Sequence, residues 1–267
     1  MQFEEWASKN LRNRYLSLIR RIKEKKLVEQ CTVPFVPYVG PHYYDAKYKM
    51  LFIGKATYGW GKGDGGQDSG TLKGVLRMDD QALWDHLAYL PQEFIEGTII
   101  PHYGGLITER RRAFWRRIYQ LGGQLLRDHP AQDYKRDLRR SEECFRSIAW
   151  SNVFKFGALK SAKGNPKRRL IELQKEENSR YGNAFAEEIR ALQPDVVIFS
   201  TGPNEYDDHI RDLLPEVFID KDKDVGPPHL RIKEIKGLDT LAFRTCHFQH
   251  YSNENFGRLA QFVCDQL

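Results

Sequence analysis

Long hydrophobic runs and clustered cysteines are both missing from this chain of 267 residues. No stretch approaches the roughly 20 consecutive apolar residues that a membrane-spanning helix needs. The first residues, M-Q-F-E-E-W, lack the apolar segment of a secretion signal. We therefore expect a cytoplasmic protein with no membrane partner. The four cysteines are far apart and form no C-x-x-C pair, which argues against zinc ribbons and iron–sulfur clusters and favours reduced thiols: Cys31, Cys144, Cys246 and Cys264.

The usual phosphate-binding motifs are also absent. Gly61 and Lys62 are followed by Gly63, where a P-loop requires Ser or Thr. The run G-K-G-D-G-G fits G-x-G-x-x-G, but it begins seven residues after Gly54 and opens no clear helix. Dinucleotide binding is therefore not favoured, because it needs a tight strand–turn–helix geometry.

Hydrolase and metal motifs fail as well. No G-x-S-x-G elbow is present, so a serine hydrolase triad has no support. His247 and His250 follow Cys246, but a third ligand at a suitable spacing is lacking. We expect no metal and no cofactor.

Four short apolar runs, each four to nine residues long, are the main structural signal of the chain. They read as strands and are separated by helical patterns. The expected strands are Met50–Ile53, Ile148–Phe156, Asp195–Ser200 and Leu241–Cys246. The expected helices are 3–28, Asp79–Leu90, Glu109–Leu126, Glu176–Leu192, Asn204–Leu214 and Asn253–Leu267. This alternation predicts an α/β protein: a three-layer α/β/α sandwich around a central, mostly parallel four-stranded sheet.

The chain reads as a single domain over 1–267, because no linker interrupts the pattern. An N-terminal helix and an extended lead-in occupy 1–45, and the α/β core with its insertions occupies 46–267. Residues 91–108 read as a loop, and 217–236 as a hairpin or excursion. We expect a monomer.

A net charge of +6 favours a polyanionic partner such as DNA. Basic residues concentrate in Arg20–Lys26, in Arg110–Arg117 and in 160–169, where they could follow phosphates. A solvated helix surface is the preferred explanation of the first cluster, and it explains the second equally well.

Polar residues follow three of the predicted strands. Gly54-Lys55-Ala56-Thr57-Tyr58 follows the first, Ser151-Asn152 lies in the second, and His247 follows the fourth. The carboxyl ends of parallel strands meet at one edge of a sheet, where ligands of open α/β sheets bind. Trp60 follows in the same Gly-rich stretch and belongs to the same expected site.

Taken together, these segments resemble the uracil-DNA glycosylase superfamily. L-F-I-G-K-A-T-Y, W-S-N-V-F-K, P-D-V-V-I-F-S-T-G and F-R-T-C-H stand in the order of that superfamily's motifs. The likeness spans roughly residues 50–260. It implies the same α/β/α fold and hydrolysis of the N-glycosidic bond of uracil or another deaminated base in DNA.

The resemblance also implies residue roles that are chemically reasonable. Asn152 would read the Watson–Crick edge of a flipped base, since an amide both donates and accepts. His247, with His250 as the alternative, would stabilise the negative charge of the departing base. Tyr58 stands where one branch excludes the thymine methyl, and Trp60 or Phe154 could stack on the base.

The sequence departs from the family at several positions. Lys55 and Ala56 occupy the places where several branches carry a carboxylate or amide that handles water, so Asp64 or Asp68 would have to substitute. Thr57 replaces the usual proline. Phe156 stands where the iron–sulfur branch has cysteine, so no cluster is expected. The alternative function is a nucleic-acid or nucleotide-binding module that has the same fold and impaired catalysis.

Overall fold

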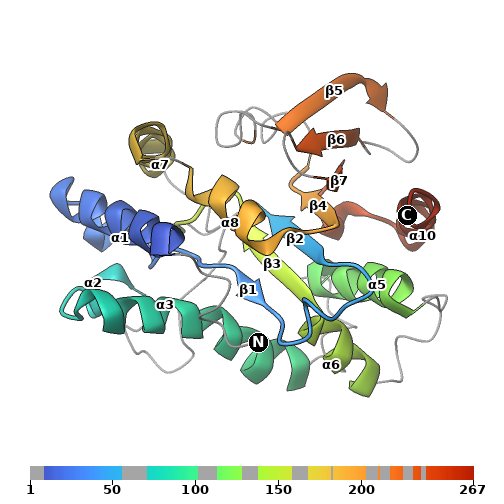
Figure 1. Cartoon of the computed structure of the whole chain (residues 1–267), viewed down its shortest axis with the longest axis horizontal. Coiled ribbons are helices and arrows are strands. Elements are labelled where there is room, and N and C mark those ends of the chain that lie inside the picture. Colours follow the sequence, from blue (N-terminus) through green and yellow to red (C-terminus); the bar gives the residue numbers. More distant parts are fainter. Residues whose placement is uncertain are drawn as a thin grey trace.

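The computed structural model describes residues 9–55, 71–101, 113–127, 138–157, 168–181, 183–202, 210, 217–224, 231–235 and 239–267. Its centre is a seven-stranded sheet in the order β1-β3-β2-β4-β7-β6-β5 (Figure 1). The strands are β1 (Tyr38–Val39), β2 (Met50–Gly54), β3 (Ile148–Asn152), β4 (Val196–Ser200), β5 (Val217–Asp224), β6 (Arg231–Ile235) and β7 (Leu241–Thr245).

The four strands predicted from the apolar runs form the parallel part of the sheet. β2 pairs with β3 on one side and with β4 on the other, and β4 pairs with β7. The described residues of these strands are buried on both faces, with only Leu241 partly exposed, which explains their nearly uninterrupted apolar sequences.

The sheet is larger than the four strands expected. β1 adds an antiparallel edge beside β3. The predicted hairpin forms as β5 and β6, and it extends the sheet beyond β7 because β6 pairs antiparallel with β7. The prediction of an α/β fold with a mostly parallel core is therefore correct, whereas the four-stranded count is not. A two-residue edge strand such as β1 carries too short a pattern to be read from sequence.

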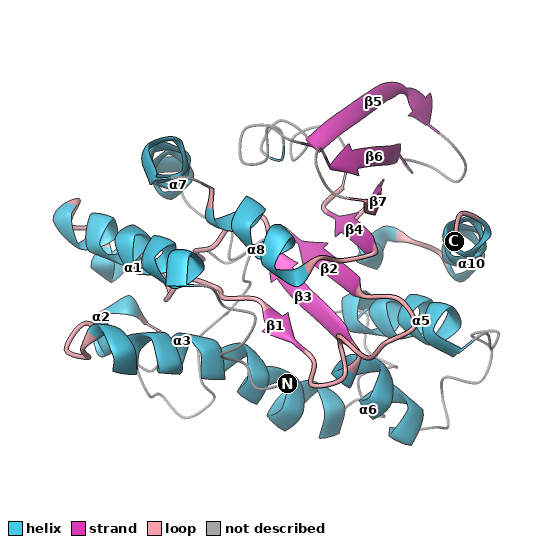
Figure 2. Ribbon diagram, viewed as in Figure 1, coloured by secondary structure: helices cyan, strands magenta, loops and turns pink. Residues whose placement is uncertain are grey.

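Helices lie against both faces of the parallel strands (Figure 2). On one face, Phe185 of α8 (Ala184–Leu192) packs edge-on against Phe199 of β4. On the other, Trp115 of α5 (Ala113–Arg127) packs edge-on against Trp150 of β3. The remaining helices are α1 (Lys9–Glu24), α2 (Leu72–Val75), α3 (Asp80–Phe94), α6 (Leu138–Arg146), α7 (Arg168–Tyr181) and α10 (Asn253–Asp265), with short helical turns at Val28–Gln30, Ile95–Ile99 and Phe248–His250.

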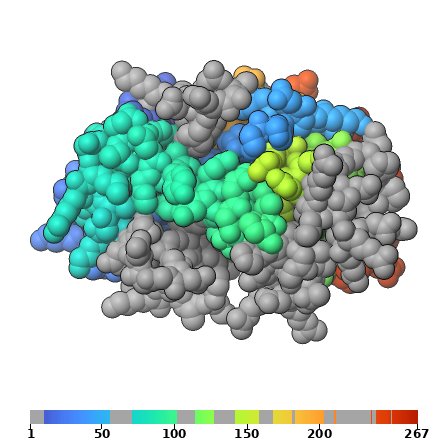
Figure 3. Space-filling view, turned by 90° about the horizontal axis from the view of Figure 1, so that it is seen from below, coloured from blue at the N-terminus to red at the C-terminus, as the bar shows by residue number. Residues whose placement is uncertain are grey.

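Several helix boundaries differ from the sequence expectation, each for a local reason. The stretch predicted as one helix, Glu176–Leu192, is two, because Asn183 caps a new helix by accepting from the N–H groups of Phe185 and Ala186. α3 continues past Leu90 through the buried Pro91, and a π-helical turn extends it to Ile99, so the first part of the predicted 91–108 loop is helical. Seen from below, α2 and α3 cover a continuous strip of the surface (Figure 3).

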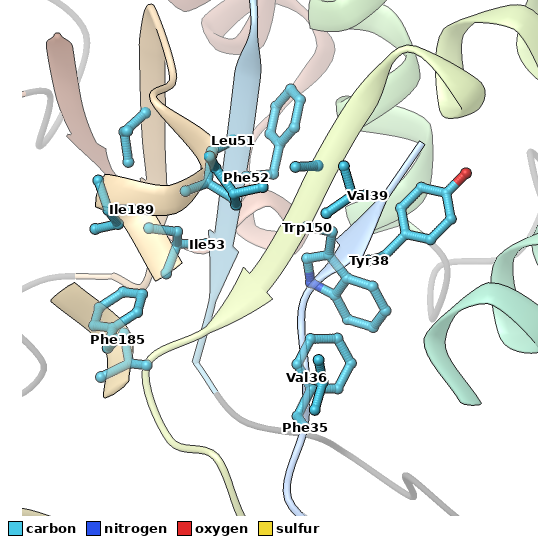
Figure 4. Packing of buried hydrophobic residues seen from close by; sticks show 14 of the residues in the cluster. Phe35, Val36, Tyr38, Val39, Leu51, Phe52, Ile53, Trp150, Phe185 and Ile189 are labelled. Carbon is cyan, nitrogen blue, oxygen red and sulfur yellow. The ribbon is translucent and has the colours of Figure 1, made fainter. Parts of the chain in front are cut away.

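The hydrophobic core joins both ends of the chain in one cluster that runs from Leu11 to Val263. Figure 4 shows its two sides: Ile53 lies towards Phe185 and Ile189 of α8, whereas Trp150 lies beside Phe35 of the extended lead-in, with ring centroids 4.5 Å apart. Burial on this scale supplies the main free energy of folding. It also fixes the strands whose ends carry the candidate site.

Candidate functional site at the carboxyl ends of the parallel strands

The chain leaves β2 towards β3 on one side and later returns to β4 on the other side of β2. This change of direction makes the β2–β4 boundary a topological switch point, where ligands of open α/β sheets bind beyond the carboxyl ends of the strands. Asn152, Lys55, Gly202 and His247 lie in or just after the carboxyl ends of β3, β2, β4 and β7.

Asn152 is the last residue of β3 and pairs with Gly54, the last residue of β2. Its side chain is 1% exposed, and its Nδ2 has no hydrogen-bond partner among the described residues. Glycine is required beside it, since an ideal Cβ on Gly54 would lie 2.5 Å from Asn152 Oδ1 and 3.7 Å from Trp150 Nε1. The amide therefore lies directly against the backbone of the neighbouring strand.

The segment after Asn152 is held by backbone and side-chain hydrogen bonds. The N–H groups of Val153 and Phe154 donate to the carbonyls of Gly54 and Lys55, at 3.0 and 3.1 Å. Gln174 of α7 then accepts from the N–H of Lys155 and donates to the carbonyl of Val153, both at 3.0 Å. These bonds limit the positions that the Asn152 amide can take.

A fully buried ion pair lies on the opposite face of this strand end. Lys155 Nζ is 2.6 Å from Glu188 Oε2 of α8 and 2.8 Å from Ser151 Oγ, and Ser151 donates to the same carboxylate at 2.7 Å. The Tyr15 hydroxyl of α1 donates to Glu188 Oε1. Burial lowers the pKa of Lys155 and raises that of Glu188, while the opposite charge of the partner acts against both changes.

His247 follows β7 and is held neutral by its surroundings. Its ring stacks on Phe114 of α5, with centroids 5.8 Å apart and planes at 28°, and lies 6.0 Å from the ring of His250. Burial, with smaller contributions from the charges of Lys55 and His250, lowers the pKa of His247 from 6.5 to about 4. A neutral imidazole at pH 7 can donate a hydrogen bond to a developing anion without first transferring a proton.

Lys55 reaches the same place from β2. Its Nζ lies 3.4 Å from the position of an ideal Cβ on Gly202, and the backbone nitrogen of His247 lies 3.7 Å from that point. Gly202 has φ +83, a left-handed conformation that glycine adopts without strain. The ammonium group and the His247 loop therefore meet over the turn that follows β4.

Arg117 fixes the His247 loop to α5. The guanidinium is 1% exposed, donates to Tyr251 O and Asn253 Oδ1 at 3.0 Å each, and lies 4.6 Å from the centroid of the Phe256 ring. One turn earlier, the same helix supplies Phe114, which stacks on His247. Arg117 is thus structural, and the expectation that it lies on a solvated or DNA-facing helix surface is wrong.

Phe114 links the two halves of the site, with its ring 6.4 Å from Trp150 and 5.8 Å from His247. Trp60 and Phe154 are the stacking rings predicted from the sequence. Phe154 lies in the hydrophobic core at 2% exposure, so the structure favours Phe114 over it. One sequence signal could have identified this part of the site. Arg117 lies three residues after Phe114, in the apolar stripe of α5, where a charged residue is unexpected.

The remaining predicted site residues lie outside the described part of the chain and stay predictions: Ala56, Thr57, Tyr58, Trp60, Asp64 and Asp68. Of the predicted site side chains, Asn152 lies at the end of β3 and His247 lies after β7, and the rings of Trp150 and Phe114 lie between these strand ends. Tyr58 lies outside the described residues. Of the basic segments, Arg168 and Arg169 are exposed at the start of α7.

Comparisons with known proteins add no assignment: no family model matches the chain, and no curated protein matches it. Within the described residues, no three His, Cys, Asp or Glu side chains are grouped so that they could hold a metal ion. The helices described are all too short or too polar to cross a membrane.

Proposed function

We propose that this protein is a monomeric DNA glycosylase of the uracil-DNA glycosylase type, which hydrolyses the N-glycosidic bond of uracil or another deaminated base. The observation that carries the proposal is the buried amide of Asn152. Its Nδ2 lacks a hydrogen-bond partner among the described residues, and it lies at the carboxyl edge of the parallel strands, where a neutral histidine also follows a strand. An unpartnered buried amide costs about 1–3 kcal/mol, which a base that pairs with it would recover.

The proposed binding step uses both sides of the amide. Asn152 Nδ2 donates to O4 of uracil, and Oδ1 accepts from N3–H, so that cytosine is rejected by its reversed donor and acceptor. The base reaches the amide only after it has been flipped out of the duplex. Phe114 is the described aromatic ring closest to His247 on which the flipped base could stack.

The proposed bond-breaking step places negative charge on the base. The C1′–N1 bond breaks, its electron pair leaves with the base, and the sugar becomes oxocarbenium-like. His247 donates to O2 as this charge develops, as its neutral state allows. Water then adds to C1′, and Asp64, Asp68 and Asn152 itself are the candidate groups that position it.

The test is release of free base from oligonucleotides that contain uracil, hypoxanthine or xanthine, single-stranded and opposite each normal base. Abasic sites are detected by alkaline strand scission, and the free base by chromatography. No release from any of these substrates would reject the proposal.

A pair of glycine variants provides a structural control. An ideal Cβ on Gly54 lies 2.5 Å from the Asn152 amide oxygen, whereas a Cβ on Gly123 of α5 has no atom within 4 Å. Gly54→Ala should lower base release by on the order of 10-fold or more by displacing the amide, and Gly123→Ala should leave it unchanged. Equal activity of both variants would argue against Asn152 as the base-reading group.

The second candidate is a nucleic-acid or nucleotide-binding module with impaired catalysis. It is favoured by Lys55, which stands where several branches of the resembled family carry a carboxylate or amide. Such a protein would bind DNA with an affinity that falls steeply with salt and would release no base. The same oligonucleotides, tested for binding and for release, separate the two functions.

A further inference from the structure

The ammonium group of Lys55 lies beside the start of the His247 loop, above Gly202. Lys55 Nζ and the backbone nitrogen of His247 lie 3.4 and 3.7 Å from one point above Gly202. The same ammonium group is among the charges that disfavour protonation of the His247 ring. The geometry therefore places a positive charge beside a neutral hydrogen-bond donor.

This arrangement suits an anion better than a cation. A carboxylate after β2 would stabilise the positive sugar of a dissociative transition state. An ammonium group in its place repels that sugar and attracts the leaving base, because opposite charges a few ångströms apart interact strongly in a partly buried site. The positive charge of Lys55 would thus stabilise the leaving base and not the sugar.

We propose that Lys55 is a catalytic residue of the glycosylase reaction, whose ammonium group contacts the departing base and neutralises its negative charge. This inference rests on the function proposed above. Lys55 keeps its proton throughout. The bond between C1′ and the base breaks with both electrons on the base, water supplies hydroxide to C1′, and the remaining proton of that water neutralises the released base through solvent.

The test compares two leaving groups in single-turnover base release. 5-Fluorouracil leaves as a more stable anion than uracil and depends less on a neutralising cation. Lys55→Met should slow release of uracil by on the order of 10²-fold and release of 5-fluorouracil by on the order of 10-fold. Lys55→Arg should restore part of the rate, since it keeps the charge.

Lys49→Met is the matched control. Lys49 precedes the opposite end of the same strand, β2, and its Nζ lies 3.6 Å from Asp195 Oδ1. This variant should release both bases at the wild-type rate. Equal slowing of uracil and 5-fluorouracil by Lys55→Met would overturn the inference, because a lysine that only binds DNA or supports the loop cannot distinguish leaving groups.

A binding measurement separates failure of this inference from failure of the proposed function. Barbiturate has a uracil-like edge and carries a full negative charge at neutral pH. The wild-type protein should bind barbiturate at least tenfold more tightly than uracil, and both Lys55→Met and Lys55→Gln should lose the preference. A wild-type protein that releases no base refutes the glycosylase proposal. A wild-type protein that releases base but binds both rings equally refutes only the role of Lys55.

Discussion

Asn152 has a buried side chain whose amide nitrogen lacks a hydrogen-bond partner among the described residues. Buried polar groups in folded proteins are nearly all paired, so an exception requires an explanation. A residue that is kept for binding does not stabilise the free protein. Its replacement should therefore reduce function and leave stability nearly unchanged.

Replacement of Asn152 by alanine tests this separation. We expect the free energy of unfolding to change by less than about 1 kcal/mol, because the amide nitrogen has no hydrogen-bond partner among the described residues. Base release should fall by on the order of 10²-fold or more. Urea denaturation and single-turnover release measure the two quantities, and a large loss of stability would indicate that Asn152 serves the fold.

His247 should make the stability of the protein depend on pH. Its pKa is about 4 in the folded protein against 6.5 ordinarily, so the unfolded chain binds more protons between these values. Its contribution is therefore complete above about pH 6.5 and is lost as the pH falls towards 4. At pH 5 the loss should be about 1–2 kcal/mol.

Denaturation of the wild-type protein and of His247→Asn at pH 7 and pH 5 measures this effect. The variant should lose less stability on acidification than the wild type does. Replacement of the exposed His42, whose ring is not part of the site, is the control and should leave the wild-type pH dependence in place. Identical pH dependence of wild type and His247→Asn would contradict the partly buried, neutral state of His247.

At the scale of elements, α5 both stacks on the His247 loop and holds it. Phe114 contacts the imidazole, and Arg117 binds the carbonyl of Tyr251 and the side chain of Asn253. The buried guanidinium of Arg117 thus joins α5 to a loop more than 100 residues later in the sequence. The position of His247 depends on that contact.

Arg117→Met should free the loop and destabilise the protein by about 2–4 kcal/mol, because the acceptors that bind the guanidinium lose their donor. The pKa of His247 should rise towards its ordinary value as the ring loses its burial. NMR titration of the imidazole follows this directly. Arg258→Met, on the exposed surface of α10, is the control, and an unchanged His247 pKa in Arg117→Met would show that the loop is held by other contacts.

At the scale of the whole molecule, the buried pair Lys155–Glu188 joins three parts of the chain. Tyr15 of the N-terminal helix, β3 and α8 meet at the one carboxylate. Lys155 also lies 4.8 Å from the centroid of the Phe185 ring. Because this network lies inside the hydrophobic cluster, its loss should lower the stability of the whole molecule.

Lys155→Met leaves Glu188 buried without its counter-charge and should cost about 3–5 kcal/mol of stability. Adding Glu188→Gln should recover most of this, since glutamine removes the charge and keeps one acceptor oxygen, while the hydroxyl that faces its NH2 group can turn to accept from it. Urea denaturation of the single and double variants gives the coupling. Arg168→Met, from the exposed Arg168–Glu172 pair, should have no measurable effect. Additive single and double variants would exclude a coupled pair.

Much of the fold can be predicted from the sequence, because strands that are buried on both faces have nearly uninterrupted apolar sequences. β2, β3, β4 and β7 appear as apolar runs, and glycine after the first run marks where the strand ends. Asn152 and His247 are identified because they stand at strand ends. β1 is missed because a two-residue edge strand depends on β3, a partner far away in sequence. α6 is missed too, and so is the break at Asn183, although its cap is local.

The sequence by itself determines the parallel core and the residues at its carboxyl edge, because strand periodicity and strand ends are local properties of the chain. Only the tertiary structure decides that Phe114 stacks on His247, that Arg117 is buried, and that Lys55 approaches the His247 loop over Gly202. These are contacts between segments from about 130 to more than 190 residues apart, brought together by sheet order and helix packing. No local pattern encodes which distant side chain will fill a given space.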